Sequence, residues 1–188
     1  MKYLFAFIFL IQFSTFAQKP CEYSSNFTDS IGSYKATKGY VVHERNFAGK
    51  SSYIFFSLVN ASGTPILNFQ QIEKSAEFLK ANCLDATSKI YLQLSNGKIV
   101  TLHYSDQESC GNMVPVTEEK KYSRVLSGSF LFTKGSFEEL KKSPVSLMRV
   151  KYTTGMVDYA FKKELVSELT KETYAPENYF INYVDCLE

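Results

Sequence analysis

The reactive side chains of this sequence are densest in one short segment, His-Tyr-Ser-Asp-Gln-Glu-Ser-Cys, which runs from His103 to Cys110. Its imidazole and carboxylates can move protons or bind a polar ligand. With Cys110 as a thiolate the segment also holds the ligand types of a zinc site, and Cys110 with His103 would be a nucleophile and its base. Because loops carry function more often than strands do, we select His103, Asp106 and Glu108 as candidate binding residues.

The rest of the sequence does not complete a catalytic, metal or cofactor site. The second histidine, His43, precedes Glu44 on a predicted strand and lacks the helical spacing of paired histidine ligands. A Gly-x-Ser-x-Gly nucleophile turn and a glycine-rich phosphate loop are both missing from the sequence. We therefore predict no catalytic residue, no metal and no cofactor, and we expect both histidines to make polar contacts on a sheet face.

The composition is rich in aromatic residues, with 16 phenylalanines, 13 tyrosines and no tryptophan, and this favours strands. Tyrosines that point outward from a sheet would form an aromatic face suited to carbohydrate or protein contact. If helices cover that face, the same tyrosines belong to the core, which is the arrangement we expect. The tyrosines on predicted strands are Tyr40, Tyr53, Tyr91, Tyr104, Tyr122, Tyr152 and Tyr159.

The N-terminal residues have the three-part layout of a secretory signal peptide. Lys2 gives the positive start, residues 3–13 are almost entirely apolar, and Thr15 and Ala17 are small residues at the positions that signal peptidase recognises. The apolar run is shorter than the about 20 residues that a transmembrane helix needs. We therefore predict that residues 1–17 are removed, that the mature chain has no transmembrane helix, and that the protein is periplasmic or extracellular.

The four cysteines are an even number, which in an exported chain indicates disulfides, with three pairings open. Cys83 and Cys110 flank one predicted hairpin, so their spacing favours a bond between them. Cys21 and Cys186 would then join the two ends of the chain. Free thiols are the alternative, because four cysteines in about 170 mature residues do not make a disulfide-dependent scaffold.

The charge of the chain is close to neutral and is dispersed. The formal net charge is +2, and it falls to about +1 when Lys2 leaves with the signal peptide. The densest run of charged residues has no net charge, because it contains two glutamates and two lysines, Glu118-Glu119-Lys120-Lys121. Nucleic-acid binding needs a concentrated basic field, so we exclude nucleic acid as the natural partner. The oligomeric state stays open.

Alternating apolar residues and turn residues predict strands through the first half of the mature chain. Residues 18–33 hold Pro20, Gly32 and several polar residues, and we expect them to form an irregular N-terminal arm. Asn96-Gly97 supplies the tight turn of the clearest hairpin, at residues 89–104. The other elements expected here are strands at residues 34–44, 52–60 and 66–72 and a short helix at residues 75–82.

The middle of the chain is expected to contain a long surface loop at residues 106–119 and a strand at residues 122–133. Gly128 lies inside that strand and predicts a weak point or a bulge. Ser136 and Glu139 then have the spacing of a capping box, which predicts the start of a short helix.

The last third of the sequence predicts one more hairpin and two helices. Residues 145–152 and 156–161 would pair around a Thr-Thr-Gly turn, with Arg149 facing Asp158 as a structural ion pair. Apolar residues at helical spacing predict the helices at residues 162–173 and 178–187.

The two halves share an order of elements that we interpret as an internal repeat over residues 52–105 and 122–173. Each copy would consist of a strand, a short helix and a hairpin, although many antiparallel α+β proteins show the same order. We predict an α+β fold, in which C-terminal helices pack on one face of an antiparallel sheet. Residues 34–188 are expected to form one domain.

Two stretches of the chain resemble small exported proteins of unknown function from Bacteroidetes, of the flavobacterial type. One is the signal segment with its Phe-Ala-Gln ending, in the first 20 residues. The other is about 30 residues long, at residues 130–161, and contains Leu-Lys-Lys-Ser-Pro, Arg149 and Val157-Asp158-Tyr159. The resemblance includes no catalytic residue, so it implies only an exported protein and a fold of that kind.

The sequence as a whole favours an exported, non-enzymatic domain that binds a protein or a glycan of the cell envelope. The alternatives are a hydrolase whose site forms only in the folded chain and an accessory subunit of a surface assembly. A binding domain or a subunit would expose a broad apolar or aromatic patch. A hydrolase would instead have a deep pocket with convergent polar groups and perturbed pKa values.

Overall fold

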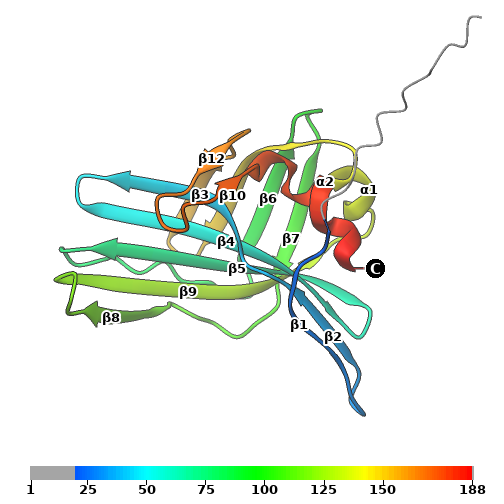
Figure 1. Ribbon diagram of the computed structural model, residues 1–188, viewed down its shortest axis with the longest axis horizontal. Helices are drawn as coiled ribbons and strands as arrows, with labels where there is room; N and C mark the ends of the chain where they lie inside the picture. The colour runs from blue at the N-terminus through cyan, green and yellow to red at the C-terminus, as the bar shows by residue number, and fades with distance from the viewer. Residues whose placement is uncertain (1–19, 188) are drawn as a thin grey trace, which may run out of the picture.

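The structure, a computed structural model that describes residues 20–187, is dominated by one large antiparallel sheet (Figure 1). Strands account for 55% of the chain and helical segments for 10%. The predicted α+β class is therefore wrong, because the helices are short and cover no face of the sheet. The predicted signal peptide at residues 1–17 lies outside the described residues.

The main sheet contains strands β1 to β11, and a second small sheet contains β12 and β13. The bounds of the main-sheet strands are β1 (Tyr23–Thr28), β2 (Ser33–Thr37), β3 (Tyr40–Phe47), β4 (Lys50–Ala61), β5 (Thr64–Ser75), β6 (Lys89–Leu94), β7 (Ile99–Tyr104), β8 (Asn112–Val116), β9 (Lys121–Phe132), β10 (Val145–Tyr152) and β11 (Gly155–Ala160). The remaining elements are β12 (Leu165–Val166), β13 (Thr173–Tyr174), α1 (Ser136–Leu140), the 3₁₀ turn η1 (Pro176–Asn178), α2 (Tyr179–Tyr183) and η2 (Val184–Leu187).

The sheet bends because two of its long strands each have two partners along one edge. The strand order is β1-β2-β4-β5-β9-β7-β6-β10-β11, with β3 also paired to β4 and β8 also paired to β9. The first half of β9 pairs with β8 and its end pairs with β7. In Figure 1, β6 and β7 consequently run steeply across the direction of β4, β5 and β9. The sheet folds over itself and encloses the main core.

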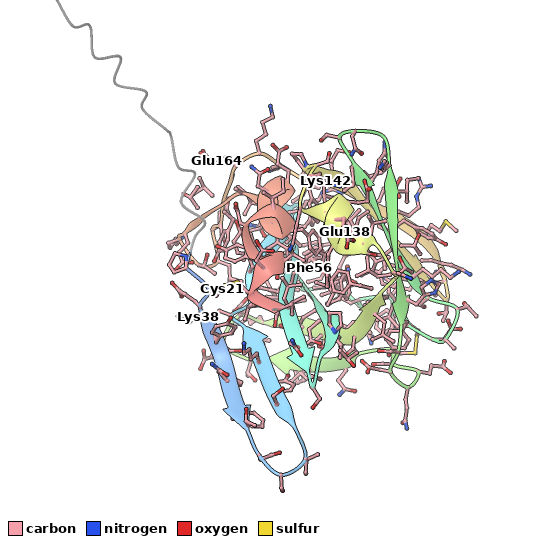
Figure 2. The ribbon with its side chains drawn as sticks, turned by 90° about the vertical axis from the view of Figure 1, so that its right-hand side faces the viewer. Cys21, Lys38, Phe56, Glu138, Lys142 and Glu164 are labelled. Carbon is pink, nitrogen blue, oxygen red and sulfur yellow. A yellow bond between two sulfur atoms is a disulfide. The ribbon has the colours of Figure 1, made fainter. Side chains whose placement is uncertain are left out.

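The core is built from the inward side chains of both limbs of the bent sheet. Phe56, Phe69 and Phe130 come from β4, β5 and β9 and are at most 1% exposed. Leu92 and Met148 face them from β6 and β10. Figure 2 shows Phe56 in the middle of this packed layer. Alternation along each strand gives the other face of β4, β5 and β9 a mixture of polar side chains and apolar ones such as Phe55 and Leu131.

Gly128 is a close-packing position, so the predicted bulge there is wrong. The register between β5 and β9 runs without a shift from Ile66 opposite Leu131 to Ser75 opposite Tyr122. A Cβ atom on Gly128 would lie 2.6 Å from the Tyr104 ring and close to Leu84. Glycine therefore lets the Tyr104 ring lie directly against β9.

The helix predicted at residues 75–82 is wrong. β5 continues to Ser75, whose buried hydroxyl accepts a hydrogen bond from the Glu77 amide. The following chain is irregular, and the Arg124 guanidinium donates a hydrogen bond to the Leu79 carbonyl at 3.1 Å. So short a helix is unstable without a packed apolar face, and Phe78 is 74% exposed.

The helix predicted at residues 162–173 is also wrong, because this segment forms the β12–β13 hairpin. Leu165 packs in extended conformation on Val41 of β3. The Ser167 hydroxyl accepts hydrogen bonds from the amides of Leu169 and Thr170 and so builds a turn. Such local side-chain bonds compete with helix formation.

Two segments predicted to lack regular structure contain strands. The N-terminal arm at residues 18–33 includes β1, which forms a hairpin with β2 that extends away from the body in both figures. The loop at residues 106–119 includes β8, which pairs with β9. The repeat at residues 52–105 and 122–173 stays a prediction, although its first copy lacks the expected helix.

Several local predictions are confirmed. The Asn96-Gly97 hairpin joins β6 to β7, and β10 pairs with β11 so that Arg149 lies opposite Asp158. Their side chains form two hydrogen bonds of 2.6 Å. α1 begins at Ser136 as expected, but its N-cap is Gly135 and the capping box does not form.

Both predicted disulfides are present, Cys83–Cys110 and Cys21–Cys186. The second one ties the chain before β1 to η2, across a sequence separation of 165. Within residues 20–187, no helix is long and apolar enough to cross a membrane.

Candidate functional site

The loop residues selected from the sequence do not gather into one site. His103 is exposed on β7 and lies opposite Leu131 of β9. The Asp106 carboxylate accepts a hydrogen bond of 2.6 Å from the Ser129 amide, and Glu108 is exposed. In residues 20–187, no hydrogen bond or ion pair joins His103, Asp106 and Glu108 to one another. A binding role for these three residues stays a prediction.

The chemistry first considered for Cys110 is excluded by its disulfide with Cys83, because a bridged sulfur is neither a thiolate ligand nor a nucleophile. Among the described residues, no group of three or more histidine, cysteine, aspartate or glutamate side chains is placed to hold a metal ion.

A hollow of about 510 Å³ lies beside the break between β2 and β3, and we call it the tyrosine groove. Tyr40, Tyr174, Tyr179 and Tyr183 line it. Its other lining residues are Pro20, Glu22, Thr37, Lys38, Gly39, Glu172 and Thr173. Its volume lies in the range of small-molecule binding sites.

The tyrosine groove is built where the sheet edge is interrupted. β2 pairs with the end of β4 and β3 pairs with its beginning, so the chain at Lys38 and Gly39 has no strand partner in β4. Tyr40 begins β3, Tyr174 ends β13, and Tyr179 and Tyr183 lie one helical turn apart on α2. Segments far apart in the sequence thus meet at one edge.

Tyr40 is the centre of the tyrosine groove. Its ring centroid lies 4.8 Å from that of Tyr174, 5.0 Å from that of Tyr179 and 5.3 Å from that of Tyr183. These separations fall in the favourable range for tilted and edge-to-face aromatic pairs. The Ala175 amide donates a hydrogen bond of 2.7 Å to the Tyr40 hydroxyl, which fixes the ring.

The phenols of the tyrosine groove are neutral over the physiological pH range. Burial raises the pKa of Tyr40 to about 12, opposed by the hydrogen bond from Ala175. Burial also raises the pKa of Tyr174, Tyr179 and Tyr183 above the usual value for tyrosine. A neutral phenol can both donate and accept a hydrogen bond.

The Tyr179 hydroxyl is buried and, within the described residues, has no hydrogen-bond partner of normal geometry. The Thr37 hydroxyl, which accepts a hydrogen bond from the Leu58 amide, is near enough to Tyr179 to oppose the rise in its pKa. The Tyr179 hydroxyl is therefore enclosed in the wall of the groove, beside the Thr37 hydroxyl.

Charged groups stand at the rim of the tyrosine groove. Lys38 and Glu22 form an exposed ion pair of 2.8 Å, which lowers the pKa of the Glu22 carboxyl. The Glu172 carboxylate accepts a hydrogen bond of 2.8 Å from the Tyr174 hydroxyl. The rim thus presents carboxylate acceptors and the Lys38 ammonium donor around an aromatic wall.

The Cys21–Cys186 disulfide fastens the N-terminal wall of the tyrosine groove to its helical wall. The Tyr23 hydroxyl adds a hydrogen bond of 3.1 Å to the Cys186 carbonyl. Figure 2 shows Cys21 and Lys38 beside the C-terminal helical segment, at the base of the β1–β2 hairpin. The groove is therefore largely pre-formed.

A second hollow, of about 360 Å³, lies on the outer face of β4, β5 and β9. We call it the polar shelf, after the side chains of Ser57, Asn68, Gln70, Ser127 and Ser129 that line it. Ser57, Asn68 and Ser129 form one cross-strand row. The other residues that border this hollow are Gly39, Phe55, Phe56, Phe69, Asp106 and Gly128.

A polar cluster is buried between the two limbs of the sheet. The Tyr152 hydroxyl lies 3.0 Å from both the Gln71 side chain and the Tyr159 hydroxyl. Burial raises the pKa of Glu73 on the same face of β5 and lowers the pKa of His43, whose ring contacts Tyr159. Convergent groups with shifted pKa values are typical of functional sites.

Sequence reasoning missed most of the tyrosine groove. Of its four tyrosines only Tyr40 belongs to the set on predicted strands. Tyr53, Tyr104, Tyr152 and Tyr159 of that set are buried in the folded chain, although the helices that we expected over them do not pack on a face of the sheet. The sequence feature that could have pointed to the groove is the close spacing of three tyrosines between residues 174 and 183.

Comparison of the chain with protein-family models, with curated proteins and with solved structures finds no match.

Proposed function

We propose that this chain is an exported binding module without catalytic activity, and that its tyrosine groove holds a saccharide segment of a cell-envelope glycan. The observation that carries the proposal is the contact of Tyr174, Tyr179 and Tyr183 with the ring of Tyr40 at the wall of an open hollow. Export follows from the N-terminal sequence pattern, and two disulfides are compatible with it.

A saccharide suits this groove because a pyranose ring has both an apolar C–H face and a rim of hydroxyl groups. The C–H face packs on the negative face of an aromatic ring. The hydroxyl groups can donate to the carboxylates of Glu22 and Glu172 and exchange hydrogen bonds with the half-buried phenol of Tyr183. Neutral phenols make these contacts without a charge cost.

Binding of the signal-processed protein to a glycan array tests this proposal, with hits measured again by calorimetric titration. The decisive variant is Tyr183→Ala, which removes a half-buried ring from the groove wall. We expect it to weaken binding by about tenfold or more. Tyr91→Ala is the matched control, since Tyr91 is half-buried on β6 and outside the groove.

Two results contradict the proposal. One is the absence of any glycan that binds the wild-type protein. The other is a glycan whose affinity is lowered equally by Tyr91→Ala and Tyr183→Ala, because such binding would not use the groove.

The hydrolase alternative rests on the buried polar cluster. Burial raises the pKa of Glu73, which suits a general acid, while the nearby Arg124 opposes that shift. If the cluster is catalytic, Glu73→Gln abolishes any hydrolytic activity found in a substrate screen. Activity that is unchanged in Glu73→Gln rules out this role.

The accessory-subunit alternative rests on the outer face of β6, β7, β10 and β11. Ile99 and Met156 are 64% and 58% exposed there, around a hollow of about 230 Å³ that Leu147 and Arg149 also line. Crosslinking in the native envelope would identify a stoichiometric partner on this face. Loss of that crosslink in Met156→Lys would support the subunit role, and its persistence would contradict it.

A further inference from the structure

We propose that the tyrosine groove and the polar shelf are two parts of one binding groove for a linear, uncharged oligosaccharide. The two hollows meet at Gly39, which borders both. This inference rests on the proposed saccharide function and adds the length and chemistry of the ligand.

At the junction between the two hollows, the nearest side-chain atom to the Cβ position of Gly39 is on the Phe55 ring of β4. Gly39 is exposed in the chain that joins β2 to β3. A Cβ atom added to it would meet only the Phe55 ring, at 4.0 Å. Phe55 and Tyr40 both pack against the small cluster that contains Tyr174. An aromatic surface thus continues from the tyrosine groove to the start of the shelf.

The polar shelf has the chemistry of a hydroxyl-binding surface. The Gln70 amide donates to the Ser127 hydroxyl at 3.3 Å, and the Ser129 hydroxyl donates to the Asn68 side chain at 3.3 Å. Each of these amides and hydroxyls keeps further donor or acceptor capacity. Asp106 is the one charged residue among those that line the shelf. Neutral groups that both donate and accept match a chain of sugar hydroxyls.

The shelf does not suit the main alternative ligand, an extended peptide. A peptide strand gains affinity by hydrogen-bonding to a free sheet edge. β5 runs through the centre of the shelf and is paired with β4 on one side and β9 on the other. Only side chains are available there. The carboxylates of Glu22, Glu172 and Asp106 also disfavour a polyanionic glycan.

Calorimetric titration with cello- and chito-oligosaccharides, from the monosaccharide to the hexasaccharide, tests the continuous groove. In whichever of the two series binds more tightly, we expect the affinity to rise by about tenfold or more from the monosaccharide to the hexasaccharide, because longer ligands reach past Gly39 onto the shelf. Gly39→Leu places a side chain at the junction. It should remove the gain with length, so that the hexasaccharide binds no more tightly than the shortest ligand of its series.

A second variant keeps the test independent of the junction. Gln70→Ala combined with Ser127→Ala removes two exposed shelf side chains and should also reduce the gain with length. The matched control is Gln93→Ala, which changes an exposed glutamine of β6 on the other limb of the sheet.

The outcomes separate this inference from the proposed function. Saccharide binding that depends on Tyr183 but not on ligand length overturns the continuous groove and leaves the binding function standing. A gain with length that survives both Gly39→Leu and the double shelf variant also overturns it. If no saccharide binds, or if a peptide library gives the only ligand, both proposals fail.

Discussion

The Ala175 amide donates a hydrogen bond of 2.7 Å to the hydroxyl of Tyr40, 135 positions earlier in the chain. Through this contact the turn that follows β13 is fixed to the first residue of β3. It holds Tyr174 and the helical turn of α2 around the Tyr40 ring, and so determines the width of the tyrosine groove.

Tyr40→Phe should loosen the groove without collapsing it. The ring remains, but the Ala175 amide loses its acceptor, which we expect to cost about 1–2 kcal/mol of unfolding free energy. Urea denaturation measures this loss, with Tyr91→Phe as a control. Saccharide affinity should fall together with stability. Equal stability of Tyr40→Phe and wild type would mean that water replaces the phenol as acceptor.

The Cys21–Cys186 disulfide should contribute more to stability than Cys83–Cys110. Its sequence separation is 165, against 27 for the other bond. In the loop-entropy model, a disulfide of the length of Cys83–Cys110 raises the free energy of unfolding by about 2–4 kcal/mol. The longer loop closed by Cys21–Cys186 should raise it by about 1–2 kcal/mol more. The comparison uses urea unfolding of Cys21→Ser/Cys186→Ser and Cys83→Ser/Cys110→Ser. The opposite order of stabilities would show that the loop model fails for this chain.

Gly128→Ala should destabilise the core. The added methyl group would lie 2.6 Å from the Tyr104 ring, and overpacking of this kind costs about 1–3 kcal/mol. Gly39→Ala is the control, because its added Cβ would meet only the Phe55 ring at ordinary van der Waals distance. Thermal melts of the two variants provide the measurement. A melting temperature lowered equally by both would contradict the close packing at β9.

His43 should make the protein less stable as the pH falls. Burial and the charges of Lys162 and Arg45 lower the pKa of His43 from 6.5, while Glu44 opposes them. The folded state thus binds the proton less readily than the unfolded chain does. The stabilising contribution is complete above about pH 6.5 and is lost as the pH falls through the lowered pKa of the folded state.

Chemical denaturation of wild type and His43→Gln between about pH 5 and pH 8 measures this dependence. The variant should show a flatter profile of stability against pH, since glutamine does not titrate. Lys151→Gln on β10 controls for the introduction of a glutamine at another strand position. Parallel profiles for His43→Gln and wild type would place the acid sensitivity in other residues.

Sequence patterns were most informative where structure is local. Asn96-Gly97 gave the correct hairpin because the turn needs a positive φ angle, which Gly97 adopts at 85°. Arg149 and Asp158 were paired correctly because a short turn sets the register between their strands. The two disulfides also followed from spacing.

Helix prediction failed where tertiary contacts outweighed local preference. Leu165, Val166 and Leu169 have helical spacing, yet Leu165 gains more by packing on Val41 in an extended strand. A helix of this length depends on packing for its stability, and the outer face of β3 offered a better partner for a hairpin.

By itself the sequence determined the signal-peptide pattern, the near-neutral charge and most of the strands, since each depends on residue type and short spacing, and it favoured the disulfide pairing that the structure shows. Only the tertiary structure decided that the sheet bends and that Tyr40, Tyr174, Tyr179 and Tyr183 meet. The physical reason is that β2 and β3 share one edge of β4 and leave a break at Lys38 and Gly39. No local pattern encodes where two distant strands stop pairing.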